Sequence, residues 1–410
     1  MNGPETKTSW PVHPIAELLE RVRRPVEVEL EETYQEIGIR SHCKGIFHKP
    51  PTTGKVLGQK RVFWVEPGCL VFNIVFAWEQ AVAMTSDEED GMIASHRFPM
   101  YRGRDGRMLA EYAWRYFSTV RGKHDLGIAS PGGAGRNKTL GQDELAHLRI
   151  PVPPIQHQQL VVEVLGSTDR AVEAIEALLQ AKRCARDGLA EHLLSGRLRA
   201  SGSTGEWKTR RLGDVSQVSK GAGASKAELA ESGLPVVRYG ELYGVYGARI
   251  DETRSHISPD AARQSRRIQQ GDILLAGSGE DRREIGMAAA YMGRAPAYAG
   301  GDTIIVTPSG LHSVFLAYLL RSSTVRREFF RRAQGESVVH LYMRDVEALE
   351  LMLPPFEEQA RIASVIESAD REISLLSRKA AAFRLLKTGL AQRLLDGGRL
   401  DMQNLEEAGR

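Results

Sequence analysis

The sequence predicts an α+β chain in which two domains of short strands and helices alternate with two long helices. Three observations predict this fold class. The segment 153–196 is repeated at 354–397. Each copy carries apolar residues at alternating steps of four and three, and about 150 residues of mixed strand and helix pattern precede each copy. A chain of 410 residues also exceeds what one hydrophobic core usually serves.

The repeat itself is the clearest internal signal. Each residue of the first copy stands 201 positions before its counterpart, and roughly a third of the aligned positions are identical. The identical pairs include Pro153/Pro354, Pro154/Pro355, Gln158/Gln359, Asp169/Asp370, Arg170/Arg371, Gly188/Gly389, Leu189/Leu390, Leu193/Leu394 and Leu194/Leu395. One extra glycine, Gly398, then shifts the register. An identity of this length at one offset indicates duplication.

Each copy is predicted to form one long helix. The Pro-Pro step suits a helix start, because proline's missing N–H costs nothing in the first turn. Gly196 and Gly397 stand where a C-terminal cap would be. The 4-3 spacing is typical of a coiled coil, so the partner of each helix is the other copy; packing of each helix on its own domain is the alternative. Gly188 and Gly389 indicate a close helix contact or a bend, although common ancestry alone could retain them.

The domain before each helix is predicted to be mixed. Short β-rich runs are expected at 35–40, 61–65 and 69–75 in the first domain and at 235–239, 272–276 and 303–307 in the second. Helical stretches follow at 109–120 and 313–332, and a last strand enters each Pro-Pro step. The predicted boundaries are 1–152 for domain 1, 153–198 for helix 1, 199–206 for a linker, 207–353 for domain 2, 354–400 for helix 2 and 401–410 for a disordered tail.

The sequence contains no motif that favours a catalytic, metal-binding or cofactor-binding site. The loop 131–139 has Asn137 before Lys138, where a phosphate-binding loop needs glycine. We expect no catalytic, metal-binding or cofactor-binding residues: the Pro-Pro steps lack the Asn or Asp that a DNA methyltransferase needs, and the acidic residues lack a magnesium-site pattern. Cys43, Cys69 and Cys184 form no zinc or disulfide pattern. No apolar run approaches the length of a membrane span and no secretory signal is present, so we expect a cytoplasmic protein without membrane contact.

Basic residues gather in comparable places of both halves. A net charge of +3 is uninformative, so their position matters more than their number. We predict a DNA-binding surface in which phosphate contacts dominate and a few side chains read bases, whereas ordinary solvated arginines are the alternative for each residue. The candidates are Arg121, Lys123, Arg136, Asn137, Lys138, Arg326, Arg327, Arg331, Arg332, Ser337, His340 and Arg344.

The segment Leu353-Pro-Pro-Phe-Glu-Glu-Gln359, with Ala-Arg-Ile362, Asp370 and Leu390-Ala-Gln-Arg-Leu-Leu-Asp-Gly397, resembles the spacer helix of type I restriction-modification specificity subunits. Trp207-Lys and Arg211-Leu-Gly-Asp-Val215 resemble the opening of their target recognition domains. The resemblance covers the chain in order, although the first copy has Gln156-His157 where the second has Glu357-Glu358. It implies two target recognition domains and two helices that pair as an antiparallel coiled coil.

The resemblance also implies a function and partners. The chain would read a bipartite site in double-stranded DNA, one half per domain, and its helices would set the gap between the halves. It would be a non-catalytic subunit that docks two modification subunits, which bring S-adenosylmethionine, and restriction subunits would join that core. A coiled-coil organiser that binds only proteins is the alternative.

Overall fold

The computed structural model describes residues 10–132 and 138–395. The chain divides into two compact units: unit 1 is formed by 1–176 with 378–410, and unit 2 by 177–377. Each of the two long helices therefore contributes one half to each unit. Among the described residues, no helix is long and apolar enough to cross a membrane.

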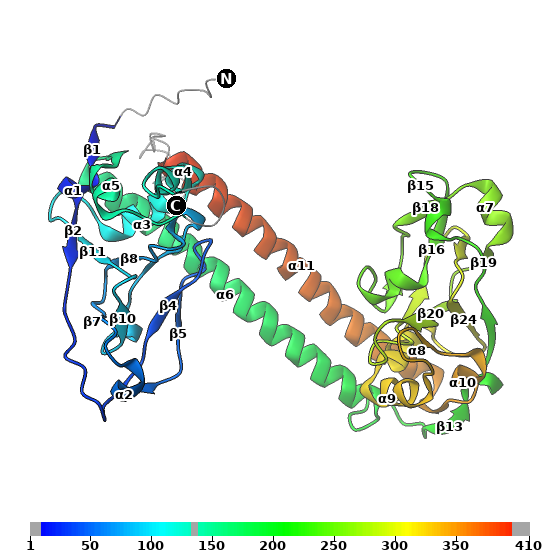
Figure 1. The fold of residues 1–410 in the computed structure, drawn as a ribbon. Coiled ribbons are helices and arrows are strands. Elements are labelled where there is room, and N and C mark those ends of the chain that lie inside the picture. The colour runs from blue at the N-terminus through cyan, green and yellow to red at the C-terminus, as the bar shows by residue number, and fades with distance from the viewer. Residues whose placement is uncertain (1–9, 133–137, 396–410) are drawn as a thin grey trace. The chain divides into compact units, whose positions relative to one another are not determined.

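Unit 1 is built from short elements before the first long helix (Figure 1). Its strands are β1 (Val12–Pro14), β2 (Leu19–Val22), β3 (Thr33–Tyr34), β4 (Ile37–Ile39), β5 (Ile46–His48), β6 (Thr52–Thr53), β7 (Val62–Trp64), β8 (Leu70–Phe72), β9 (Val82–Met84), β10 (Ile93–Ser95), β11 (Met100–Gly103) and β12 (Arg149–Pro151). Its helices are α1 (Ile15–Leu18), α2 (Gly54–Leu57), α3 (Ala110–Phe117), α4 (Val120–Ile128), α5 (Gln142–His147) and the first part of α6 (Ile155–Leu194), with single 3-10 turns at Ala77–Glu79 and Asp87–Glu89.

Unit 2 has more strands and the same order of parts. The strands are β13 (Lys208–Arg211), β14 (Ser216–Lys220), β15 (Leu229–Ala230), β16 (Leu234–Val237), β17 (Arg249–Ile250), β18 (Ser255–Ile257), β19 (Arg266–Ile268), β20 (Ile273–Ala276), β21 (Ser278–Gly279), β22 (Ala288–Tyr291), β23 (Ala297–Ala299), β24 (Thr303–Pro308), β25 (Val339–His340) and β26 (Glu350–Leu353). The helices are α7 (Pro259–Gln264), α8 (Ser313–Arg321), α9 (Ser323–Arg332), α10 (Met343–Glu347) and the first part of α11 (Phe356–Leu395), with 3-10 turns at Leu212–Asp214, Lys226–Glu228 and Tyr239–Tyr243.

The two units share one sheet topology. The main sheet of unit 1 has the order β2-β11-β8-β9, and that of unit 2 has the order β14-β24-β20-β22 with β17 added at the edge. In both units the first strand pairs antiparallel with the strand that enters the long helix, β1 with β12 and β13 with β26. The duplication therefore includes the whole domain, although sequence identity is confined mainly to the helices. Unit 2 alone carries a second five-stranded sheet, β15-β18-β16-β23-β19.

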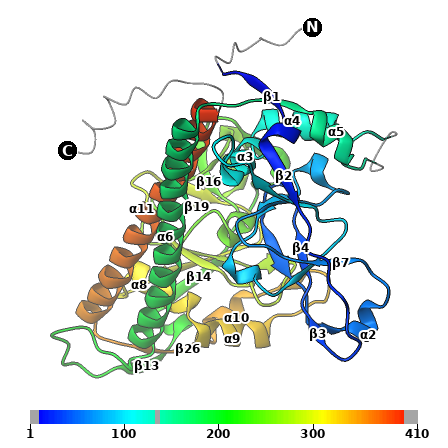
Figure 2. The same cartoon turned by 90° about the vertical axis from the view of Figure 1, so that its left-hand side faces the viewer.

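The two long helices pair antiparallel within each unit (Figure 2). In unit 1, Glu176 of α6 pairs with Arg384 of α11, and Asp169 pairs with Lys387 further along. The residue number rises along one helix as it falls along the other. In unit 2, Lys182 pairs with Glu372 at 2.8 Å and Arg186 with Asp370 at 2.8 Å, again in opposite order.

The predicted 4-3 stripe is the least exposed face of each helix. In α11 it includes the buried residues Ile362, Ile366, Ala380 and Leu394. The helix ends complete the domain cores: Leu394 and Leu395 join the core of unit 1, whereas Leu193 and Leu194 join that of unit 2. Each domain thus packs on the start of its own helix and the end of the other, and the predicted α+β fold with paired helices is confirmed.

Most predicted elements are present, with some corrections. Strands occur within or beside all six predicted runs, but many further strands, β9, β11 and β22 of the main sheets among them, were missed. The helical stretch 313–332 is broken at Ser322, whose hydroxyl caps α9. Gly196 has the left-handed φ of 74° expected of a cap; Gly397 lies outside the described residues. The close helix contact expected at Gly188 and Gly389 is wrong, because no atom lies within 4 Å of a Cβ placed at either.

Candidate nucleic-acid interface

The same arrangement of hydrogen bonds, made by one glutamine in each unit, joins each domain to its long helix. The Gln158 amide oxygen accepts from the Leu109 backbone N–H at 2.9 Å, just before α3, and its amide nitrogen donates to the Pro153 carbonyl at 2.9 Å. Gln359 accepts from the His312 N–H at 2.9 Å, just before α8, and donates to Pro354 at 2.8 Å. Both amides are buried, so each glutamine fixes the helix that follows the sheet against the long helix.

This junction places α4 and α9 in equivalent positions, and both carry predicted DNA contacts. Thr119 caps α4, accepting from the Gly122 N–H at 3.0 Å, and Ser322 caps α9 in the same way. The buried side chains Val325 and Phe329 anchor one face of α9. Cations on the remaining faces can therefore be presented to a ligand.

Four arginines of α9 differ in how they are held. The Arg326 guanidinium donates to the backbone carbonyls of Arg283, Glu284 and Ile285, and burial lowers its pKa. Arg326 therefore supports the 283–285 loop. Arg331 pairs with Glu328 at 2.7 Å, and Arg332 lies 3.7 Å from the same carboxylate. Arg327 is exposed and donates a hydrogen bond to Thr324 Oγ1 at 3.3 Å.

The segment that follows α9 brings the other predicted residues of unit 2 together. Ser337 is exposed, and His340 is half-buried with Nδ1 2.9 Å from Ser278 Oγ. The Arg344 guanidinium lies 5.3 Å from the centre of the Tyr342 ring. His340 and Arg344 line a recess in unit 2, whereas Ser337 lies outside its lining.

The predicted residues of unit 1 are more dispersed. Lys123 is exposed and Arg121 half-buried on α4. The Lys138 ammonium lies 5.6 Å from the centre of the Trp78 ring. Arg136 and Asn137 lie outside the described residues.

A group of cations lies on the β2 and β11 side of unit 1; sequence reasoning names Arg102 among the basic residues of this domain but misses Arg21 and Arg24 beside it. Arg24 and Arg102 both pair with Glu66, at 2.8 and 3.5 Å, and both are 54% exposed. Arg21 donates to Gln142, and burial lowers its pKa. The pairing of β2 with β11 joins residues about 80 positions apart, so no local sequence signal identifies this group.

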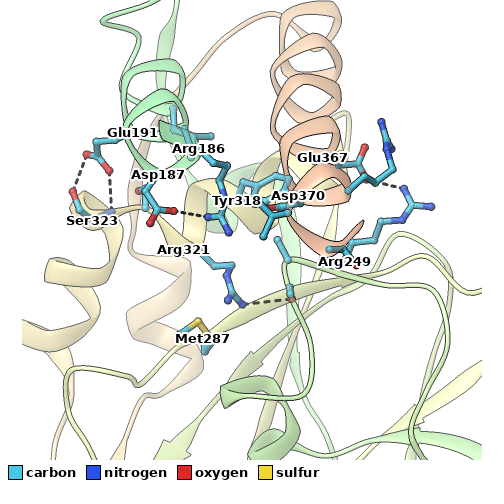
Figure 3. Close-up of a pocket in the computed structure, with 18 of the residues that line it drawn as sticks. Arg186, Asp187, Glu191, Arg249, Met287, Tyr318, Arg321, Ser323, Glu367 and Asp370 are labelled. Carbon is cyan, nitrogen blue, oxygen red and sulfur yellow. Dashed lines mark hydrogen bonds and ion pairs between the residues drawn. The ribbon is translucent and has the colours of Figure 1, made fainter. Parts of the chain in front are cut away.

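A hollow of about 910 Å³ in unit 2 is a polar junction where both long helices meet the domain (Figure 3). Its charged groups are paired with one another. Arg186 and Tyr318 contact Asp370 at 2.8 and 2.6 Å, and Arg249 contacts Glu367 at 2.9 Å.

A further arginine of this hollow, Arg321, donates to the Ala288 carbonyl at 2.9 Å, and burial lowers its pKa to about 10. The internal pairing makes this hollow a structural connection between helices and domain, not a ligand site. Over the part of the chain that the structure describes, no three His, Cys, Asp or Glu side chains gather as a metal site.

Comparison with known proteins agrees with this architecture. Residues 204–382 match the family described as the type I restriction modification DNA specificity domain. The type I restriction enzyme MjaVIII specificity subunit of Methanocaldococcus jannaschii is 22% identical over 273 residues, which cover 63% of this chain. The match spans 64% of that relative, slightly less than two thirds of its length.

Solved structures share the fold over nearly the whole chain. The HsdS subunit from Thermoanaerobacter tengcongensis is 17% identical with a TM-score of 0.53, covering 95% of this chain and 97% of that one. The type I restriction-modification S subunit from M. genitalium is 13% identical with a TM-score of 0.58, covering 96% and 98%.

The fold and the matched residues define the class: a two-unit chain in which residues 204–382 match a DNA specificity domain and the first unit repeats the main-sheet order of the second. The chain is similar to the specificity subunits of type I restriction-modification systems.

Proposed function

We propose that the chain recognises the DNA sequence for a type I restriction-modification complex. Residues 1–152 and 207–353 are the two target recognition domains, and each binds one half of a bipartite site in double-stranded DNA. The observation that carries this proposal is the repeated sheet order, together with the specificity-domain match in one copy. Two equivalent modules suit two half-sites read independently.

The proposed contact surface follows from exposure and charge. In unit 2, Arg327 and Arg331 on α9 contact phosphates, with Ser337 beside them. In unit 1, Lys123 and Arg121 on α4 have the corresponding role, with Lys138 on the adjoining loop. Arg326 and Arg332 are given a supporting role, because backbone carbonyls engage Arg326 and the Arg332 side chain is only 32% exposed, against 71% for Arg331. Phosphate contacts of this kind supply affinity without sequence information. Arg136 and Asn137 remain candidates on sequence grounds.

The long helices are the proposed docking surface for partner subunits. Leu375 in unit 2 is 59% exposed and Leu385 in unit 1 is 76% exposed, and both lie outside the stripe that joins α6 to α11. Exposed apolar side chains on a helix suit a protein partner. We propose two modification subunits here, which supply S-adenosylmethionine and the methyl transfer, with restriction subunits joining that core. The chain itself then contributes no catalytic group.

The proposal is tested by gel shift of the full chain with its modification subunit, on random duplexes and on a duplex selected from a random pool. We expect retention of both at low salt, and a preference for the selected duplex of about a thousandfold or more at physiological salt. A complex that retains no duplex at low salt contradicts the proposal and favours the protein-binding organiser.

A further inference from the structure

The second unit has a recess of about 500 Å³ at one end of its five-stranded main sheet. Its walls are the ends of β14, β20 and β24, and the segment 334–344 that follows α9. The polar side chains that line it are Lys220, Ser278, Asp302, Gln334, His340, Tyr342 and Arg344. Apart from one carboxylate, this lining consists of groups that can donate hydrogen bonds.

His340 is held in a fixed orientation within the recess. Ser278, which is 3% exposed, places its hydroxyl oxygen 2.9 Å from His340 Nδ1. The short ladder of β21 with β25 sets the two backbones side by side. Reciprocal backbone hydrogen bonds of 2.7 and 3.0 Å tie His340 to Gln334. Ser278 therefore occupies one ring nitrogen and leaves Nε2 as the ring atom that a ligand can reach.

The rim combines cations with an exposed aromatic ring. Tyr342 is 44% exposed, and the exposed Arg344 guanidinium lies 5.3 Å from its ring centre. Lys220 pairs with Asp302 at 3.6 Å, and both side chains are close to half exposed or more. Stacking on an aromatic ring orients a guanidinium plane, which favours recognition of a planar group with two acceptors.

The serine and histidine do not form a nucleophilic pair. Ser278 is buried beneath the ring, whereas an attacking hydroxyl must reach its substrate. Among the described residues, no carboxylate bonds to the other ring nitrogen of His340, so the orienting third group of a triad is also lacking. The pair is suited to binding.

We propose that this recess reads a guanine edge in the half-site bound by unit 2, with Arg344 and His340 Nε2 donating to O6 and N7. This inference rests on the proposed function. Guanine is the base that presents two acceptors in the major groove, and arginine is its commonest partner. Ser278 is a positioning residue: its hydroxyl donates to Nδ1, which keeps the proton on Nε2. A fixed ring inside a recess distinguishes this group from cations that contact phosphate alone.

The test measures base preference with the full chain bound to its modification subunits. A random duplex pool is selected with the wild type and with Arg344→Ala, His340→Gln and Ser278→Ala, and dissociation constants are then measured for guanine and adenine at the affected position. Arg344→Ala should lower the guanine preference about tenfold or more at one position of one half-site. His340→Gln and Ser278→Ala should lower it less at the same position, and the other half-site should be unchanged.

Arg327→Ala is the matched control, since Arg327 is an exposed arginine on α9 outside the recess. It should weaken binding to all duplexes equally, and it should reduce the slope of log affinity against log salt concentration by about 1. If Arg344→Ala behaves like this control, the residue contacts phosphate and the inference is overturned while the proposed function stands. A wild type without sequence preference instead contradicts the proposed function. Arg344 is exposed, so its variant decides the matter even if Ser278→Ala unfolds.

Discussion

The two units build the same junction between domain and helix with different side chains. In each, one aspartate of the long helix faces a group from the adjoining domain and a cation from the other long helix. These sets are Asp169 with Arg115 and Lys387 in unit 1, and Asp370 with Tyr318 and Arg186 in unit 2. The acid is retained, whereas its partners need only be hydrogen-bond donors. The difference indicates that the duplication preserves geometry more strictly than residue identity.

The most damaging way to break this equivalence is to remove a leucine from the end of one long helix. Leu394 is 2% exposed in the core of unit 1, and its counterpart Leu193 is 3% exposed in the core of unit 2. Leu394→Ala should lower the free energy of unfolding of unit 1 by about 2–5 kcal/mol, because the cavity cannot fully collapse. Hydrogen exchange measured peptide by peptide assigns the loss to a unit.

Leu193→Ala is the matched control and should have the converse effect on unit 2. Leu394 belongs to α11, which starts in unit 2 and ends in the core of unit 1. Its truncation should therefore lower the stability of unit 1, although its helix begins in unit 2. Loosening of unit 2 by Leu394→Ala would contradict the shared cores.

Much of this fold is predictable from the sequence, because the helices carry a strong periodic signal. Matched identities predict the buried stripe and the helix-end leucines. The strand β11 is not predictable, since Arg102 and Gly103 interrupt its short apolar run. Tertiary pairing with β2 and β8, not local propensity, fixes it.

The candidate site is less predictable, because a cation's role depends on what surrounds it. Arg326 and Arg327 are adjacent in sequence, yet one guanidinium is engaged by backbone carbonyls and the other is exposed. The pairing of His340 with Ser278 joins residues 62 positions apart and has no sequence signature. Sequence reasoning therefore finds the segment that carries the site but does not separate supporting arginines from available ones.

A smaller effect should come from neutralising the shared aspartate. In unit 1 the pKa of Asp169 is lowered: burial acts to raise it, but hydrogen bonds from Lys387 and Arg115 outweigh that effect. Asp169→Asn removes the negative charge that faces both Arg115, whose side chain is 8% exposed, and Lys387, and should cost about 2 kcal/mol.

Asp370→Asn is the comparison variant and should cost only about 1 kcal/mol, because an amide oxygen still accepts from the Tyr318 hydroxyl. Urea unfolding combined with hydrogen exchange measures both. A larger loss for Asp370→Asn than for Asp169→Asn would show that the two junctions are held by other contacts.

The smallest predicted difference concerns pH, because each unit has a half-buried histidine at a different position of its junction. Burial lowers the pKa of His157 below 6.5 against the opposing effect of a hydrogen bond to the Leu394 carbonyl, and burial likewise lowers the pKa of His312. A folded state that binds protons less readily than the unfolded chain loses stability as pH falls through about 6.5 and levels off below the folded pKa. Both units should therefore weaken between pH 7 and pH 5.5, each by less than about 1 kcal/mol after solvent screening.

The two histidines can be separated because His157 lies on the long helix beside Trp10, at a ring distance of 4.9 Å, whereas the position of unit 2 that corresponds to His157 is Glu358. Hydrogen bonds from Arg199 lower the pKa of Glu358 below 4.5, so its contribution is lost only as pH falls further. His157→Gln should therefore remove this pH dependence from unit 1 and leave that of unit 2, measured by hydrogen exchange corrected for intrinsic rates. An unchanged pH dependence of unit 1 in this variant would mean that other groups, not His157, titrate as the junction opens.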